Sequence, residues 1–86
     1  MYRLRASVNF DRKFKKIAKK DPVLKMKVTK TLKLMRKDIN HPSLRLHKLS
    51  GVDNWSVSVG MSVRILFTIR KDRIYLADIG THDEVY

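Results

Sequence analysis

The spacing of apolar residues changes between the first and the second half of this chain, and that change constrains the fold more than any other feature. Between Phe10 and Ile39 apolar side chains recur every three to four residues, which is the period of an amphipathic helix. From Trp55 to Ile79 they recur at every second residue, which is the period of a strand with one buried face. Helices followed by a run of strands are typical of the α+β class.

A short strand and a helix are predicted at the start of the chain. Apolar and polar residues alternate over 2–8, so this strand is expected to include Val8. Asn9 is the expected N-cap of the helix that follows, because a side-chain oxygen there can accept a hydrogen bond from the first turn. We expect this helix to end near Lys20.

A second helix is predicted directly afterwards. Asp21 is its expected N-cap, and Pro22 takes the first helical position, where a missing N–H costs no hydrogen bond. Its core-facing residues recur between Leu24 and Ile39. The turn 40–42 ends the helix because the residue before a proline avoids the helical conformation, and His41 in this turn is expected to have a capping or surface role.

Three more strands are predicted after a connecting segment, 43–54. Residues 55–59 and 63–69 alternate on either side of a turn at 60–61, and a further turn at 71–72 leads to a last strand over 73–79. The predicted order is β-α-α-β-β-β in a single domain, 1–86. The two helices are expected to pack on one face of a twisted antiparallel sheet, which leaves the other face open for function.

Charge divides the chain in a similar way. Residues 1–48 contain 16 of the 20 lysines and arginines and three acidic residues, whereas the remainder contains four basic and five acidic residues. The total of +12 indicates a polyanionic partner, which could be a nucleic acid, an acidic protein or an anionic membrane surface. Charge alone does not choose among the three.

What the sequence lacks excludes several classes of function. There is no cysteine, so disulfides, thiolate zinc sites and cysteine nucleophiles are ruled out. Three scattered glycines form no P-loop or dinucleotide fingerprint, and no G-x-S-x-G element is present. No apolar run approaches the ~18 residues of a membrane span, and the first residues lack the apolar core of a signal peptide. We therefore expect a cytoplasmic protein without membrane contact.

The remaining candidates for chemistry are an arginine and the histidines. Alternation places Arg64 on the open face, because the apolar residues Val63, Ile65 and Phe67 are expected to lie on the buried face. A planar guanidinium there could bind two phosphate oxygens, although a solvated strand arginine is the plainer interpretation. The three histidines have no metal-binding spacing, so no metal is expected. His47 and His82 each lie next to a predicted strand, where a sheet can display a reactive side chain.

These residue types are sufficient for cleavage of RNA by its own 2′-hydroxyl. The reaction needs a base for that hydroxyl, an acid for the 5′-oxygen and positive charge at the phosphate, and histidine and arginine supply all three. No cofactor is required. The same residues could also serve a module that binds nucleic acid without catalysis.

Three segments carry a resemblance to a known family. They are His41–Gly51 with its His-x-Leu-x-Gly element, the strand Val63–Ile69, and the ending Asp78–Tyr86 with its Gly-Thr-His. With the β-α-α-β-β-β order, the chain resembles the RelE/ParE toxin superfamily, and within it the YafQ-type and RelE-type ribosome-dependent mRNA interferases of type II toxin–antitoxin pairs. The resemblance implies a RelE-like fold, a metal-independent endoribonuclease that inhibits translation, a cognate antitoxin, and the ribosome and mRNA as partners.

The resemblance also implies roles for single residues. His82 matches a catalytic histidine of YafQ-like toxins and His47 a second functional histidine, while Arg64 matches the strand arginine that acts on the scissile phosphate. Tyr86 resembles the C-terminal tyrosine that activates the 2′-hydroxyl or stacks on the substrate. The assignment of acid and base among His47, His82 and Tyr86 stays open. A ParE-like, non-enzymatic poison of DNA gyrase on the same fold is the alternative.

Basic residues outside the catalytic set are expected to bind ribosomal RNA through its phosphates. They are Lys13, Lys16, Lys20, Lys27, Lys30, Arg45 and Lys48. Trp55 could stack on a base, but its phase with Val57 and Val59 favours a place in the core.

Overall fold

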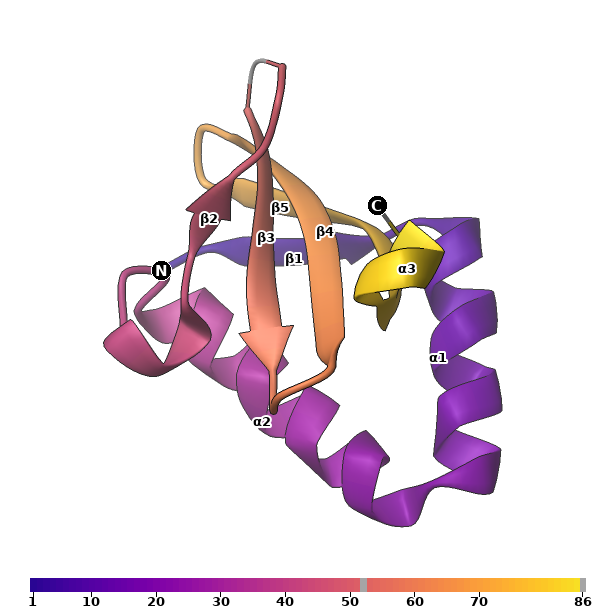
Figure 1. The fold of residues 1–86 in the computed structure, drawn as a ribbon. Helices are drawn as coiled ribbons and strands as arrows, with labels where there is room; N and C mark the ends of the chain where they lie inside the picture. The colour runs from indigo at the N-terminus through magenta and orange to yellow at the C-terminus, as the bar shows by residue number, and fades with distance from the viewer. Residues whose placement is uncertain (52, 86) are drawn as a thin grey trace.

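The computed structural model describes residues 1–51 and 53–85, and it has the predicted order of long elements (Figure 1). In chain order the elements are β1 (Arg3–Ala6), α1 (Val8–Lys20), α2 (Pro22–Lys37), the 3₁₀ turn η1 (Pro42–Leu44), β2 (His47–Lys48), β3 (Asn54–Val59), β4 (Val63–Arg70), β5 (Arg73–Thr81) and α3 (His82–Val85). The α+β class is confirmed. None of the helices in the described ranges is long and apolar enough to cross a bilayer.

The strands form one sheet in the order β1-β5-β4-β3-β2. Strands β2 to β5 pair antiparallel, but β1 pairs in parallel with β5, with Leu4 opposite Ile74. The sheet is therefore mixed, and the expectation of a purely antiparallel sheet was wrong at this edge. A parallel neighbour needs a long crossover, and here α1, α2 and the β3–β4 hairpin lie between the two partners in sequence.

Helix α1 begins two residues earlier than predicted. Ser7 is its N-cap, because the Ser7 hydroxyl accepts a hydrogen bond from the Phe10 N–H at 3.0 Å. The expectations that Val8 belongs to the strand and that Asn9 caps the helix were wrong: Val8 is in the first turn, 86% exposed. Asn9 instead donates from its amide to the Ala77 carbonyl at 3.0 Å, and Ser7 donates to the same oxygen. These bonds fix the start of α1 against β5.

Helix α2 follows the sequence-based prediction closely. The Asp21 carboxylate accepts from the Leu24 N–H at 3.0 Å, and Pro22 opens the helix. The helix ends at Lys37, before the buried Ile39. His41 caps η1 by accepting at Nδ1 from the backbone N–H of Ser43 at 3.1 Å, which confirms its capping role.

The core lies between the helices and one face of the sheet. Val57, Ile65 and Ile79 are partners across β3, β4 and β5, and each is at most 1% exposed. The helices contribute Phe10, Val28 and Met35 to the same cluster, and Trp55 packs partly buried against it. Burial of side chains of this size stabilises by about 1.5–3 kcal/mol each, so this face of the sheet is firmly fixed. Because alternate strand residues point to opposite faces, the positions of the side chains on the open face are fixed as well.

A β-bulge interrupts the pairing of β4 with β5. Leu66 is opposite Asp78 but Phe67 is opposite Leu76, so Ala77 is the extra residue of β5. The bulge turns the Ala77 carbonyl toward the two donors at the start of α1. Because of this extra residue, the residues of β5 that follow the bulge point to the opposite face from the one that regular alternation would give them.

Candidate active site

Strand register places Arg64 in the middle of the open face. Arg64 is opposite Ser58 of β3 and Gly80 of β5, and directly opposed residues in antiparallel strands point to the same face. Its neighbours in sequence, Val63 and Ile65, are buried in the core. The half-buried guanidinium therefore stands among small neighbours, on the face that the alternation predicted.

His47 lies on the same face at the β2 edge. It is opposite Ser56 of β3, which is in turn opposite Leu66 of β4, and the imidazole is exposed. The strand axes of β2 and β4 lie roughly 10 Å apart, since adjacent strands are separated by about 4.8 Å. Arg64 and His47 can thus approach one phosphodiester from two sides without touching each other. The sequence predicted a loop here because a two-residue strand shows no alternation.

His82 is the first residue of α3, a short helix that the sequence analysis did not predict. The Glu84 carboxylate accepts from the Thr81 N–H at 2.8 Å, and the Thr81 hydroxyl accepts from the Glu84 N–H at 3.3 Å. This is a capping box, and the Thr-x-x-Glu spacing in the sequence could have indicated it. Hydrogen bonds to the carboxylate, first from the backbone N–H of Thr81 and then from its side chain, hold the pKa of Glu84 below its ordinary value. The box turns the chain back over the end of the sheet, beside α1 (Figure 1).

Gly80 lets α3 approach the open face. A Cβ at this position would lie 3.1 Å from Glu84 Cβ and 3.1 Å from Val85 Cγ1. Contacts of α3 with both β4 and β5 follow from this close packing. His82 is therefore held next to the row that contains Arg64. Tyr86 lies outside the described residues, so its predicted role stays a prediction.

One ion pair lies at the edge of this face. Lys13 Nζ of α1 is 2.6 Å from Asp78 Oδ1, and the two side chains are 32% and 23% exposed. Partial burial alone would raise the pKa of Asp78, but hydrogen bonds from Lys13 and from the Ile79 N–H outweigh it and lower that pKa. Lys13 is thus bound to Asp78, whereas the sequence had placed it among the RNA-binding residues.

The other basic candidates are exposed and fall into two groups. They are Lys16 and Lys20 on α1, Lys27 and Lys30 on α2, and Arg45 and Lys48 next to the β2 edge. Lys48 Nζ lies 5.6 Å from the centroid of the Trp55 ring, a cation–π contact. In residues 1–51 and 53–85 no group of three or more His, Asp or Glu side chains is arranged to hold a metal ion.

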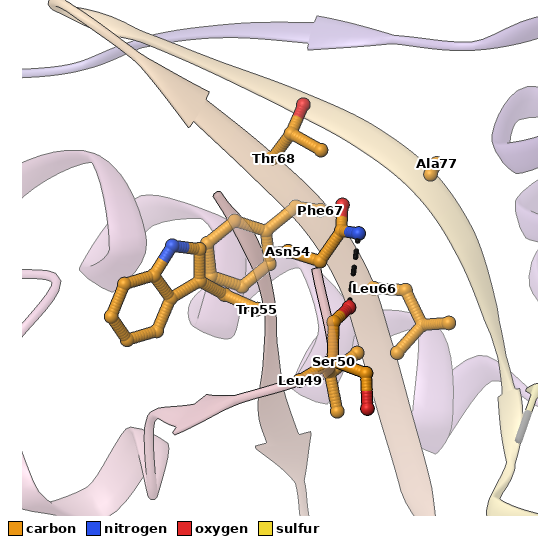
Figure 2. A pocket seen from close by; sticks show the side chains of 8 residues that line it. All are labelled: Leu49, Ser50, Asn54, Trp55, Leu66, Phe67, Thr68 and Ala77. Atoms are coloured by element: carbon orange, nitrogen blue, oxygen red, sulfur yellow. Dashed lines mark hydrogen bonds between the residues drawn. The ribbon is translucent and has the colours of Figure 1, made fainter. Parts of the chain in front are cut away.

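A pocket of about 250 Å³ opens beside the His47 row, and sequence reasoning missed it (Figure 2). Its lining residues are Leu49, Ser50, Asn54, Trp55, Leu66, Phe67, Thr68 and Ala77. The pocket forms where the β2–β3 connection lies beside β4 and the bulge of β5. No local pattern in the sequence indicates such a contact between distant segments.

Comparison with known proteins gives no match to a family model and none to a curated protein. Solved structures do match. A chain of the E. coli DinJ–YafQ complex has a TM-score of 0.84 at 14% identity and covers 100% of this chain and 99% of its own. The YoeB/ParE toxin from Agrobacterium tumefaciens has a TM-score of 0.82 at 13% identity and covers 95% of this chain and 99% of its own. A copper-bound mutant toxin from Helicobacter pylori has a TM-score of 0.79 at 20% identity and covers 100% of both chains.

The chain has the RelE/ParE-type toxin fold. Identities of 13–20% carry this conclusion for the backbone alone. The roles predicted for His47, Arg64 and His82 therefore stay predictions.

Proposed function

We propose that this protein is the toxin of a type II toxin–antitoxin pair and that it cleaves messenger RNA on the ribosome. The observation that carries the proposal is the position of Arg64 between the His47 edge and the helix that begins at His82. A phosphate bound at Arg64 would have a titratable imidazole on either side. The RelE/ParE-type fold and the open, uncovered face around Arg64 support the same function.

The proposed chemistry is transesterification within the RNA. The 2′-oxygen forms a bond to the adjacent phosphorus, its proton passes to a base, the bond from phosphorus to the 5′-oxygen breaks, and an acid protonates that oxygen. The products are a 2′,3′-cyclic phosphate and a free 5′-hydroxyl. Arg64 stabilises the negative charge that builds up on the phosphate, and His47, His82 and Tyr86 are the candidates for base and acid. No cofactor takes part in this scheme.

Ribosomal RNA would be held by the basic helices. Lys20, Lys27 and Lys30 are exposed on helices that pack against the other face of the sheet, so they can contact the ribosome while the messenger lies at Arg64. Lys16 is also exposed, but it lies beside Gly80 and Glu84 at the edge of the candidate site. Such contacts act through counterion release and make binding sensitive to salt. Arg45 lies close to His47 in the chain and would bind the messenger backbone itself. Lys48 follows His47 on β2 and points to the opposite face, over Trp55.

A cognate antitoxin is the proposed protein partner. The matching structures include complexes with a second protein: the DinJ–YafQ complex of E. coli and the YoeB–YefM toxin–antitoxin complex of Staphylococcus aureus. The charge of +12 favours an acidic partner. Val23, Met26 and Met61 are more than half exposed, and such side chains offer apolar area that a partner can bury.

Mapping of messenger 5′ ends in bacterial cells tests the proposal. Cells that express the wild type or His82→Ala are compared by primer extension, with His41→Ala as a matched control because His41 caps η1 outside the site. Cuts in register with codons are expected for the wild type and for His41→Ala, and their loss is expected for His82→Ala. Growth arrest with intact messengers would contradict the nuclease and favour a gyrase poison. A gyrase poison would also stay toxic after His47, Arg64 and His82 are all replaced by Ala. RNA binding without arrest or cleavage would favour a non-catalytic module.

A further inference from the structure

The pocket of Figure 2 has apolar walls and a polar end. Its apolar lining residues are Leu49, Trp55, Leu66, Phe67 and Ala77. Asn54 and Thr68 are opposite each other on β3 and β4 and lie at the same end. A few polar groups in an otherwise apolar pocket are the usual arrangement where a small ring system is bound and oriented. The pocket is open to solvent, and all its lining residues except the buried Phe67 are half-buried or exposed.

The amide of Asn54 is available to a ligand. Within residues 1–51 and 53–85 this side chain makes one hydrogen bond, from Nδ2 to the Ser50 carbonyl, at 3.3 Å. That length exceeds the usual range for N–H···O bonds, so the bond is weak. An asparagine amide has two donor hydrogens and an acceptor oxygen, so most of its hydrogen-bonding capacity is unused here.

The pocket is also one step along β4 from the proposed phosphate site. Leu66 follows Arg64 by two residues on the same face, so the two positions are about 7 Å apart along the strand. Leu66 is in the same row as His47. A group bound over Leu66 would thus be attached to the nucleotide whose phosphate lies at Arg64.

We infer that this pocket binds one nucleobase of the RNA substrate, next to the scissile phosphate, and that Asn54 reads the edge of that base. The inference rests on the proposed function, because Arg64 defines where the phosphate lies. The volume of the pocket fits a nucleobase. An apolar cavity of about 150 Å³ holds benzene, and this pocket of about 250 Å³ has room for a two-ring purine. Asparagine pairs with adenine through two hydrogen bonds, so adenine is the expected base.

Titration with single nucleotides tests the pocket without catalysis. The four ribonucleoside 5′-monophosphates are added to the whole protein, and its backbone amide signals are followed by NMR. We expect the signals of Leu49, Asn54, Leu66 and Thr68 to move, and adenosine monophosphate to bind most tightly. Ala77→Leu, which fills the pocket without changing charge, should weaken this binding at least tenfold. Asn54→Ala should bring the four affinities within about twofold, whereas Asn40→Ala, an exposed asparagine outside the pocket, should change nothing.

Nucleotides that move only signals around Arg64, or equal affinities for all four in the wild type, would overturn the inference. The cleavage assay then separates the pocket from the nuclease itself. Asn54→Ala should still cut messengers, with the base preference at one position beside the cut reduced about tenfold. An unchanged preference would reject the pocket and leave the nuclease intact, whereas no cutting by the wild type would reject the nuclease. If Ala77→Leu retains nucleotide binding and the cutting pattern but no longer co-purifies with antitoxin, the pocket belongs to the protein partner and the inference is wrong.

Discussion

Arg64 owes its position to its neighbours in the sequence, since Val63 and Ile65 are buried and leave it the opposite face. If it binds the phosphate, Arg64→Ala should lower the single-turnover cleavage rate about 10²- to 10³-fold, the loss seen when one group stabilising transition-state charge is removed. Arg64→Lys should recover only part of this rate, because an ammonium cannot grip two oxygens in one plane. The rate is measured on programmed ribosomes.

Arg70→Ala is the control for this prediction. It removes an exposed arginine from the far end of the same strand and should cut at the wild-type rate. Thermal denaturation of each variant excludes unfolding as the cause. A wild-type rate for folded Arg64→Ala would remove Arg64 from the chemistry.

Asp78 predicts a dependence of stability on pH. Its folded-state pKa is lowered, so folding favours the ionised carboxylate. This contribution is fully present above the unfolded-state pKa of about 3.9 and is lost as the pH falls through the folded-state value. Asp78→Asn should lower the free energy of unfolding by about 1 kcal/mol at pH 7, in the range of partly exposed ion pairs, and by much less near pH 3.

Urea denaturation at both pH values measures this difference. Asp53→Asn serves as the control, because the Asp53 side chain is exposed and outside the ion pair. An equal loss of stability at pH 7 and pH 3 for Asp78→Asn would show that the ion pair with Lys13 is not its cause.

Single residues also show how far sequence reasoning reaches. Alternation was enough to place Arg64, because a period of two assigns every strand residue to a face. It could not find Ala77 or Asn54 as pocket residues, since the bulge of β5 and the path of the β2–β3 connection decide their positions. Ser7 was missed as a cap because its hydroxyl has two partners, one of them the distant Ala77 carbonyl.

Among the elements, α3 depends on the smallest side chain in its contact. Gly80→Ala should push α3 away from the sheet, because the new methyl group would lie 3.1 Å from atoms of Glu84 and Val85. Since His82 begins this helix, we expect cleavage to fall at least tenfold while the core stays intact. Hydrogen exchange of the α3 amides, measured beside the cleavage rate, should become faster.

Gly60→Ala provides a control glycine in the same sheet. It lies in the β3–β4 turn with nothing within 4 Å of the added Cβ, and its φ of +65° adds backbone strain only there. Stability should therefore fall slightly while α3 exchange stays as in the wild type. If Gly80→Ala cuts at the wild-type rate although hydrogen exchange of its α3 amides is faster, His82 has no role in the reaction.

The long elements were predictable because each has a period that only one type of structure satisfies. Elements that span only about one period were not, because a pattern must repeat to be recognised: β2 has two residues and α3 has four. The parallel pairing of β1 with β5 also escaped prediction. It joins residues about 70 positions apart, with Leu4 opposite Ile74, and nothing local in either strand specifies that partner.

At the scale of the whole molecule, the basic charge and the candidate chemistry lie on different elements. The helices carry most of the lysines, while Arg64 and His47 lie on the sheet. The core between the two layers keeps them apart. Binding to a large polyanion and reaction at one phosphate should therefore respond to different substitutions.

Replacement of Lys20, Lys27 and Lys30 by Gln tests this separation. Binding to ribosomes should weaken, and the slope of log K against log salt should become less steep by about 0.7–0.9 for each phosphate that the variant no longer neutralises. At saturating protein the single-turnover cleavage rate should match that of the wild type, because these lysines lie outside the open face. The control replaces Arg3, Arg5 and Arg70 by Gln, which removes the same charge from exposed positions on β1 and β4, outside the two helices. An equal weakening in both variants would mean that total charge, and not a helix surface, governs binding to the ribosome.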